Sequence, residues 1–220
     1  MRAVLFDLDG TLLETNFQTF MAEYFQGVSR QFRPWMDPNE FLTNLMEATH
    51  VMTINMDETR TNLEVFTEDF FKRTSLDPAL MDQFYLYYDN EFPKLEYLTK
   101  AHPLAGKAIE TARNLDCKIV LATNPLFPRS AIMERMRWAG VDGYCFDLIT
   151  AGDNMHFCKP NVEYYQEIAR TIAVDPRDCL MIGDEPENDG VAVNCGMNTF
   201  ILDERRSLAE CIEFMLAGGV

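Results

Sequence analysis

The segment Asp7–Thr11, with the sequence DLDGT, places two carboxylates one residue apart before a glycine that permits a sharp turn. An aspartate such as Asp7 can attack phosphorus and form an aspartyl phosphate. A neighbouring acid such as Asp9 can protonate the leaving oxygen and then, as a carboxylate, activate water. An EF-hand calcium loop does not fit, because Leu12 and Gln18 stand where its glycine and glutamate belong. Taken alone, the segment is consistent with phosphoryl-transfer chemistry or with a simple turn.

Two later segments carry groups that could bind a phosphoryl oxygen. Thr123 and Asn124 close an apolar run, where a hydroxyl and backbone amides could hold such an oxygen, although both residue types are also ordinary at strand ends and caps. Lys159, followed by Pro160, precedes a predicted helix, and its ammonium could neutralise a phosphoryl group. An exposed loop lysine is the alternative interpretation of that position. Neither segment identifies a site by itself.

The segment Gly183–Asp189, with the sequence GDEPEND, carries an acidic cluster from a predicted strand toward a helix. Magnesium is bound by hard oxygen ligands, usually one or two carboxylates together with waters and substrate oxygens. Asp184 suits that role because it directly follows the strand. Acidic residues also stabilise the first turn of a helix, and for Glu187 we prefer this capping interpretation.

The segments that could carry chemistry follow apolar runs typical of buried parallel strands, beginning with Ala3–Phe6 before Asp7. After Pro103, helices and strands alternate. The sequence predicts helices near 105–115, 129–138 and 162–172, and strands over 118–122, 146–150, 179–183 and 198–202. This alternation predicts a parallel sheet with helices on both faces, whose ligand site lies beyond the carboxyl ends of the strands.

Between about residues 15 and 95 the sequence shows helical patterns and no convincing strand, which predicts an insert of three or four helices. Thr15 and Gln18 have the spacing of a capping box, which predicts a helix that starts there. Asp37 and Asp77, each followed by proline, are predicted to start later helices.

The apolar side chains of the insert are interpreted mainly as its own core. Phe17, Phe20, Tyr24 and Phe25 recur at helical spacing, which predicts a buried stripe. Most of the 13 methionines are also expected in cores, although a few in the insert could line a substrate pocket.

The composition restricts the partners of the chain. Its 220 residues include 35 acidic and 19 basic ones, for a formal net charge of -16, which disfavours nucleic acids and anionic membranes. A small phosphorylated metabolite remains a suitable partner, because a metal ion and a few aimed donors can bind it inside an acidic protein. The six cysteines form no CxxC pair and are interpreted as reduced. No apolar stretch approaches a membrane span, so a cytoplasmic location is expected, and the sequence does not indicate the oligomeric state.

Taken together, the order and spacing of four segments resemble the haloacid dehalogenase-like hydrolases. These segments are DLDGT at 7–11, Thr123 at a strand end, Lys159 before a helix, and GDxxxxD at 183–189. Many members of that superfamily carry a helical cap between the first and second motifs, as the insert does here. The resemblance implies an α/β fold with a Rossmann-like three-layer core, a central parallel sheet and an inserted all-helical cap domain.

The resemblance divides the chain into a discontinuous core, residues 1–14 and 97–220, and a helical cap, residues 15–96. The chain crosses between these modules near residues 13–15 and 98–102, where we expect hinges that absorb opening and closing. Because the core motifs recognise only the phosphoryl group that every substrate shares, substrate choice is expected to lie in the cap.

The same resemblance implies a role for each candidate residue. Asp7 resembles the family nucleophile, and Asp9 resembles its general acid and base. Thr123, with Asn124 beside it, resembles the phosphate-binding position. Lys159 resembles the lysine that neutralises charge at the reacting phosphoryl group.

The implied cofactor is Mg²⁺. Asp184 resembles the magnesium ligand, while Asp7 also contacts the metal and Asp9 contributes its backbone carbonyl. Asp189 is expected to support the lysine or a metal-bound water. Glu185 stands where relatives often have serine, and it could hold a water near the metal or simply face solvent.

The expected activity is magnesium-dependent hydrolysis of a small phosphate monoester through an aspartyl phosphate on Asp7, as in phosphoglycolate phosphatase-like members. Dehalogenation is disfavoured, because dehalogenating relatives lack an acid at the position of Asp9. A sugar phosphomutase shares every motif and remains open. A non-catalytic scaffold is disfavoured by the complete set of motifs.

Overall fold

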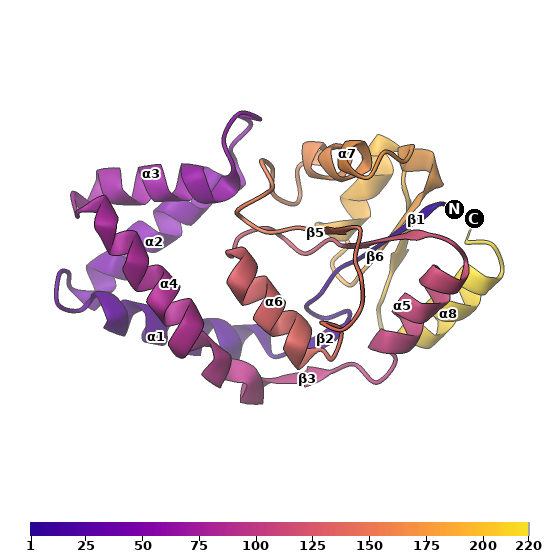
Figure 1. Cartoon of the computed structure of the whole chain (residues 1–220), viewed down its shortest axis with the longest axis horizontal. Coiled ribbons are helices and arrows are strands. Elements are labelled where there is room, and N and C mark those ends of the chain that lie inside the picture. The colour runs from indigo at the N-terminus through magenta and orange to yellow at the C-terminus, as the bar shows by residue number, and fades with distance from the viewer. Residues whose placement is uncertain (220) are drawn as a thin grey trace.

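The computed structural model describes residues 1–219 and has an α/β core at one end and a helical cap at the other (Figure 1). The core contains a parallel sheet with the strand order β5-β4-β1-β6-β7. Its strands are β1 (Ala3–Phe6), β4 (Lys118–Leu121), β5 (Leu148–Ile149), β6 (Cys179–Gly183) and β7 (Asn198–Ile201). The predicted central parallel sheet is therefore confirmed.

The central strand β1 shows why its sequence is a continuous apolar run. It pairs in parallel with β4 on one side and β6 on the other. Successive side chains of a strand point to opposite faces, so Val4 and Phe6 enter one hydrophobic core while Ala3 and Leu5 enter another. All four are fully buried, because helices cover both faces of the sheet.

Helices form the outer two layers of the core. Residues of α5 (Ala105–Asn114), α6 (Arg129–Trp138) and α8 (Leu208–Leu216) share one hydrophobic core with one face of the sheet. Residues of α7 (Val162–Thr171) and of the 3-10 helix η4 (Asp189–Cys195) share the core of the opposite face. The three-layer arrangement confirms the predicted Rossmann-like core, with α7 on the opposite side of the sheet from α5 and α8 (Figure 1).

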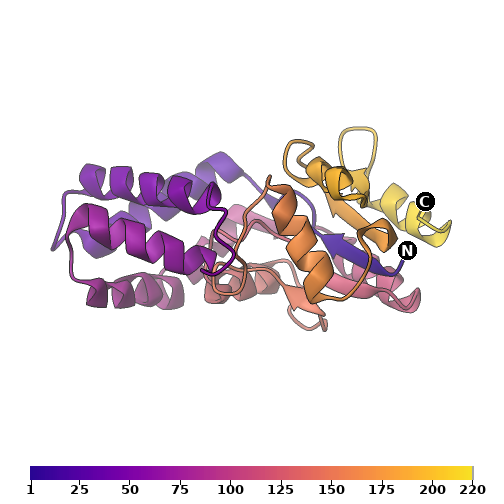
Figure 2. The ribbon, with the colours of Figure 1, turned by 90° about the horizontal axis from the view of Figure 1, so that it is seen from above.

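The cap is a set of helices packed on a core of aromatic rings. Figure 2 shows this set extending away from the sheet as a separate layered body. The ring of Phe32 lies 4.6 Å from those of Phe41 and Phe84, and all three side chains are buried. Its helices are α1 (Phe17–Phe32), α2 (Pro38–Thr53), α3 (Asn62–Thr74), η1 (Pro78–Leu80), α4 (Met81–Asn90) and η2 (Phe92–Leu98).

The chain passes between the two parts through a small antiparallel ribbon of β2 (Leu13–Thr15) and β3 (Thr99–Ala101). These segments coincide with the predicted crossings. The predicted capping box was wrong, because Thr15 belongs to the extended ribbon and helix α1 starts later. Asn16 is the N-cap, and its Oδ1 accepts a hydrogen bond of 3.1 Å from the amide of Thr19.

Most other predicted boundaries are confirmed within a few residues. Asp37 caps α2, and Asp77 caps the short helix η1 that leads into α4. The strand predicted over 146–150 is shorter in the structure. Asp147 explains part of the difference, since its side-chain Oδ2 accepts the amide of Ile119 at 2.8 Å, where a regular strand would use a backbone carbonyl.

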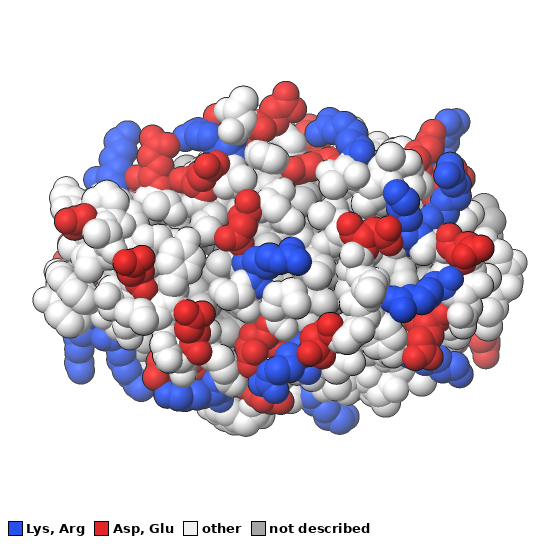
Figure 3. Space-filling model, viewed as in Figure 1, with Lys and Arg blue, Asp and Glu red and all other residues white. Residues whose placement is uncertain are grey.

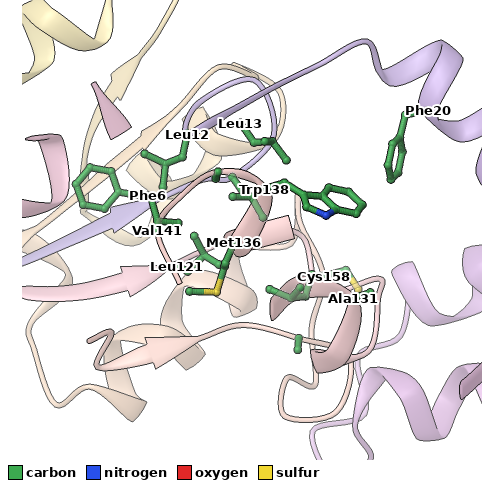
Figure 4. Close-up of a cluster of buried hydrophobic side chains, with 14 of the residues drawn as sticks. Phe6, Leu12, Leu13, Phe20, Leu121, Ala131, Met136, Trp138, Val141 and Cys158 are labelled. Carbon is green, nitrogen blue, oxygen red and sulfur yellow. The ribbon is translucent and has the colours of Figure 1, made fainter. Parts of the chain in front are cut away.

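Aromatic side chains join the cap to the core. The ring of Phe20 on α1 lies 6.2 Å from that of Trp138 on α6, and Phe92 stacks on Trp138 at 5.3 Å. Figure 4 shows Phe20 and Trp138 among the buried side chains of this cluster. The ring of Tyr24 lies 5.3 Å from Phe127 in the loop that precedes α6. These contacts belong to one hydrophobic core that continues from the sheet into the cap.

On the face of the molecule in Figure 3, acidic and basic side chains are interspersed, and no continuous basic surface crosses that face. Within residues 1–219, none of the helices combines the length and the apolar character needed to cross a bilayer.

Candidate active site

The carboxyl ends of three adjacent strands bring the candidate residues to one edge of the sheet. Asp7 directly follows β1, and Asp184 directly follows β6. Thr123 lies two residues beyond the end of β4 and is 3% exposed. Because β4, β1 and β6 are neighbours and run in the same direction, residues distant in sequence meet at this edge.

Lys159 lies between two carboxylates. Its Nζ donates to Oδ1 of Asp7 at 2.7 Å and to Oδ1 of Asp189 at 2.5 Å. The loop that carries it is held by Asn124, whose Oδ1 accepts the backbone amide of Lys159 at 3.2 Å. Burial alone would lower the pKa of Lys159, but the negative charges of Asp7 and Asp189 outweigh it and hold the pKa well above its usual value. The ammonium therefore stays charged and fixed.

Asp7 lies at the centre of this charge arrangement and is 8% exposed. Burial raises the pKa of Asp7, and the negative charges of Asp189 and Asp184 act in the same direction. The charge and hydrogen bond of Lys159 oppose that shift. A cation placed among these carboxylates would favour their ionised forms.

Three carboxylates are arranged as a cation site would require. Oxygens of Asp7, Asp184 and Asp189 all lie within 4.8 Å of one another. Within the described chain, Oδ1 of Asp184 is buried without a hydrogen-bond partner, which is costly unless another group binds it. Burial, with the charge of Asp189, raises the pKa of Asp184 to about 6. The set of hard oxygen ligands and the unpaired oxygen fit Mg²⁺.

Glycines make room for these carboxylates. Gly10 has a φ of +74°, a conformation that other residues adopt only with strain, and a Cβ there would overlap the carboxylate of Asp184. A Cβ on Gly183 would overlap the carboxylate of Asp189 in the same way. The glycine of the DLDGT segment is thus needed both for its turn and for the close approach of Asp184.

Asp189 and Glu185 differ in where their side chains lie relative to the carboxylate cluster. Asp189 is 1% exposed, and its Oδ2 accepts the backbone amide of Glu185 at 3.1 Å. The side chain of Glu185 points to the rim instead, where Oε2 accepts the side-chain amide of Asn188 at 2.5 Å. The structure therefore brings Asp189 into the carboxylate cluster, whereas Glu185 lines the cavity beside it.

Asp9 has a partner that sequence reasoning missed. Its carboxylate forms an ion pair with Nη2 of Arg135 and accepts the hydroxyl of Thr15 at 3.3 Å. Arg135 is only 4% exposed, and burial lowers its pKa to about 10 although the charge of Asp7 opposes this. A signal was present in the sequence, since Arg135 lies on the apolar stripe of α6 next to Met136 and a charged residue is unusual there.

A cavity of about 550 Å³ lies between the carboxylates and the cap. The core contributes polar groups at its floor, namely those of Asp7, Asp9, Thr123, Asn124, Arg135, Lys159, Glu185 and Asn188. The cap contributes a wall that is mostly apolar, formed by Phe17, Phe20, Met21, Tyr24, Phe25, Leu45, Met46 and Thr49. Leu126 and Phe127 of the core extend this apolar wall.

The prediction of a buried aromatic stripe on α1 was only partly right. Phe20 and Tyr24 are buried, with exposed fractions of 3% and 6%. Phe17 is 64% exposed and Phe25 is half-buried, although all four side chains line the cavity. The expectation that a few cap methionines line a pocket agrees with Met21 and Met46, which line this cavity.

Comparison with known proteins gives one family and several similar proteins. The family model described as haloacid dehalogenase-like hydrolase matches residues 1–196. The phosphorylated carbohydrates phosphatase of Thermotoga maritima is 25% identical over 197 residues, covering 90% of this chain and 82% of that protein. The phosphoglycolate phosphatase of Vibrio vulnificus is 23% identical over 211 residues, covering 91% of this chain and 82% of that protein.

Solved structures share the fold. The crystal structure of a HAD phosphatase from Thermococcus onnurineus has a TM-score of 0.60 at 20% identity, and the match covers 100% of this chain and 99% of that one. Since the family model covers most of its length, the chain belongs to the haloacid dehalogenase-like hydrolases. Within that family it is an enzyme of the phosphatase branch. The expected family, fold class and enzyme class are confirmed.

Proposed function

We propose that this phosphatase hydrolyses a small phosphate monoester with the help of Mg²⁺, through an aspartyl phosphate on Asp7. The observation that carries the proposal is the position of Lys159, held between Asp7 and Asp189 beside the carboxylate cluster, at the floor of the cavity. A fixed cation next to a carboxylate at a substrate-sized cavity suits attack on an anionic phosphoryl group.

In the first step an oxygen of Asp7 attacks phosphorus. The bond from Asp7 to phosphorus forms as the bond from phosphorus to the ester oxygen breaks, and Asp9 gives a proton to the departing alcohol. Thr123 and Asn124 line the floor where they would hold phosphoryl oxygens, while Lys159 offsets the negative charge that develops there.

In the second step Asp9 acts as a base. It takes a proton from a water molecule that attacks phosphorus, so that inorganic phosphate leaves and the carboxylate of Asp7 is restored. The ion pair with Arg135 and the hydrogen bond from Thr15 hold the carboxylate of Asp9 in one orientation. A fixed orientation is what a group that serves in both steps needs.

Asp7 and Asp184, with the backbone carbonyl of Asp9, would hold the metal, and Asp189 would support it while bonding Lys159. When bound, Mg²⁺ orients the phosphoryl group and offsets its charge against that of the carboxylates. Glu185 lines the rim, where it would hold a water near the metal.

We assign residues 1–14 and 97–220 to the catalytic core and residues 15–96 to the cap. Support comes from the ribbon of β2 and β3, which lies at both crossings of the chain between the parts. The cap supplies most of the apolar wall of the cavity, so it is the part that would distinguish one ester from another.

A phosphate-release assay with nitrophenyl phosphate and a panel of metabolite esters tests the proposal. We expect release in the presence of Mg²⁺, its loss in excess chelator, and its return when Mg²⁺ is restored. Isomerisation of a sugar phosphate without release of phosphate would indicate a mutase. Full activity in chelator would contradict the metal, and inactivity on the entire panel would favour a scaffold.

A further inference from the structure

We propose that the alcohol part of the substrate is apolar. The preferred substrates are phosphate monoesters of alcohols that carry an aromatic or aliphatic hydrocarbon body, rather than polyhydroxylated ones. This inference rests on the proposed function, because it names the substrate class of the same cavity. It is carried by the side chains of the cap wall and by the hydrogen bonds that its few polar groups already make.

One stripe of helix α1 faces the cavity with apolar side chains only. Phe17, Met21 and Phe25 are spaced four residues apart, and residues at that spacing lie on one side of a helix. The neighbouring Phe20 and Tyr24 reach the edge of the same cavity but are almost fully buried against the rest of the protein. The helix therefore uses one apolar stripe for folding and keeps a second one beside the cavity.

Large apolar side chains beside the cavity remain exposed instead of packing into the protein core. Phe17 is 64% exposed and Met46, on the facing helix α2, is 54% exposed, although both are large hydrophobic side chains. Leaving such side chains in contact with water forgoes the free energy of burying them, and clusters of this kind typically mark binding sites. A hydrocarbon body in the cavity would cover them.

The polar groups of the cap wall are already bonded within the protein. Of the cap residues that line the cavity in the described chain, Tyr24 and Thr49 carry the hydroxyls. The hydroxyl of Tyr24 lies 2.9 Å from that of Tyr88, and the hydroxyl of Thr49 donates to the carbonyl of Leu45 at 2.8 Å. A polyol bound here would bury hydroxyl groups without matching partners, which disfavours its binding.

Next to the leaving oxygen, Asp9 is paired with Nη2 of Arg135, and within the described chain only Nε of that guanidinium is buried without a hydrogen-bond partner. Arg135 is bonded to Asp9, and its guanidinium lies 5.4 Å from the centre of the Phe127 ring. The charged floor thus gives way directly to an aromatic surface. The aromatic surface begins at the position where the alcohol part of a bound substrate would extend from the phosphoryl group.

The size of the cavity supports a body larger than a two-carbon acid. Its volume of about 550 Å³ falls within the range typical of pockets for drug-sized ligands. A very small alcohol part would leave most of the apolar wall uncovered, so its burial would contribute little binding free energy. An aromatic ring, in contrast, would match the aromatic side chains that line the cavity, Phe17, Phe25 and Phe127 among them.

The test compares 2-phenylethyl phosphate with glycerol 1-phosphate. Both are esters of primary alcohols, so the two bonds to be broken are similar and the comparison reports on the cavity. We expect kcat/KM for the phenylethyl ester to exceed that for the glycerol ester by roughly 100-fold, the scale on which hydrophobic pockets discriminate. Phosphoglycolate in the same assay should resemble the glycerol ester.

A matched pair of variants locates the preference. Met46 lines the cavity and Met56 does not, yet their exposed fractions are alike, 54% and 52%, and both lie in the cap. Glutamine has about the length of methionine, and because each side chain is about half exposed, neither replacement opens a cavity in the core. Met46→Gln should reduce the preference ratio between the two esters by about tenfold, since one lost apolar contact has effects of that order. Met56→Gln should leave both esters unchanged.

The outcomes separate the two proposals. If neither ester, nor nitrophenyl phosphate, releases phosphate with Mg²⁺, the proposed function itself is wrong. If both esters are hydrolysed and the glycerol ester is equal or better, the proposed function stands and the apolar substrate class is overturned. An unchanged preference ratio in Met46→Gln would likewise overturn the role assigned to the cap wall.

Discussion

The floor and the wall of one cavity are built on opposite principles. At the floor, ionisable groups are buried and bonded to one another, as Lys159 is to Asp7 and Asp189. At the wall, apolar side chains such as Phe17 and Met46 are more than half exposed and are not packed into the core. Stabilising a transition state requires charged groups that are held in place before the substrate binds. Binding a hydrocarbon requires apolar surface that is exposed until the ligand covers it.

The two regions also differ in the elements that carry them. The floor is fixed to strand ends of a sheet that is buried on both faces, which holds groups more precisely than loops do. The wall belongs to helices α1 and α2, joined to the core through a thin ribbon and the ring contacts around Trp138. Substitutions at the floor should therefore affect turnover, and those at the wall should affect preference.

The largest effect is expected from Asp7→Asn, which breaks the floor and leaves the wall intact. The amide is nearly isosteric but cannot act as the nucleophile, so phosphate release should fall by about 10⁴-fold or more. Calorimetric titration should still detect binding of a phosphate ester, because the wall and Lys159 remain. Turnover near that of the unmodified enzyme would refute the assignment of Asp7.

A smaller effect is expected from Asp9→Asn, which removes the proposed proton donor at the border of floor and wall. Turnover of an alkyl phosphate should fall by roughly 10² to 10⁴-fold, as is typical when a general acid or base is lost. Nitrophenyl phosphate should lose less in the first step, since nitrophenolate departs without a proton.

Rapid-quench sampling of Asp9→Asn checks this directly. Phosphoenzyme should accumulate, because Asp7 can still attack while the water in the second step is no longer activated. Equal losses for both esters, with no phosphoenzyme, would show that Asp9 is not the acid and base.

The smallest effect concerns stability and is confined to the floor. In the metal-free protein, burial and the charge of Asp189 raise the pKa of Asp184 to about 6. A carboxyl whose pKa is higher in the folded state stabilises the fold at low pH, and this contribution is lost as the pH rises through about 6. Metal binding requires the ionised form, so Mg²⁺ and protons compete for the same site.

Thermal unfolding with and without Mg²⁺ measures this competition. At a magnesium concentration near 100 times its Kd, Tm should rise by about 5 to 10 °C at about pH 7.5 and clearly less at about pH 5. Asp184→Asn should abolish the rise, whereas Met56→Gln should retain it. Equal shifts at both pH values would argue against a site built from Asp184.

Much of the core could be predicted because its signals are local. The apolar run Ala3–Phe6 predicts a buried strand whatever the strand pairs with, and the next residue, Asp7, then lies at the carboxyl end of that strand. The helix over 129–138 and the strand over 179–183 have the bounds that their periodicity predicts. The short β5 was harder, because the side chain of Asp147 replaces part of its pairing.

The sequence by itself determined which residues stand at strand ends, and with them most of the candidate floor, since their positions depend on local apolar runs and turns. Only the tertiary structure decided that Phe20 is buried against Trp138 while Phe17 stays exposed, because both belong to one helical pattern and Trp138 lies more than a hundred residues away. It also decided that Arg135 meets Asp9. Such pairs depend on how distant elements pack against each other, and helical periodicity can show that a helix has an apolar side without showing what will cover it.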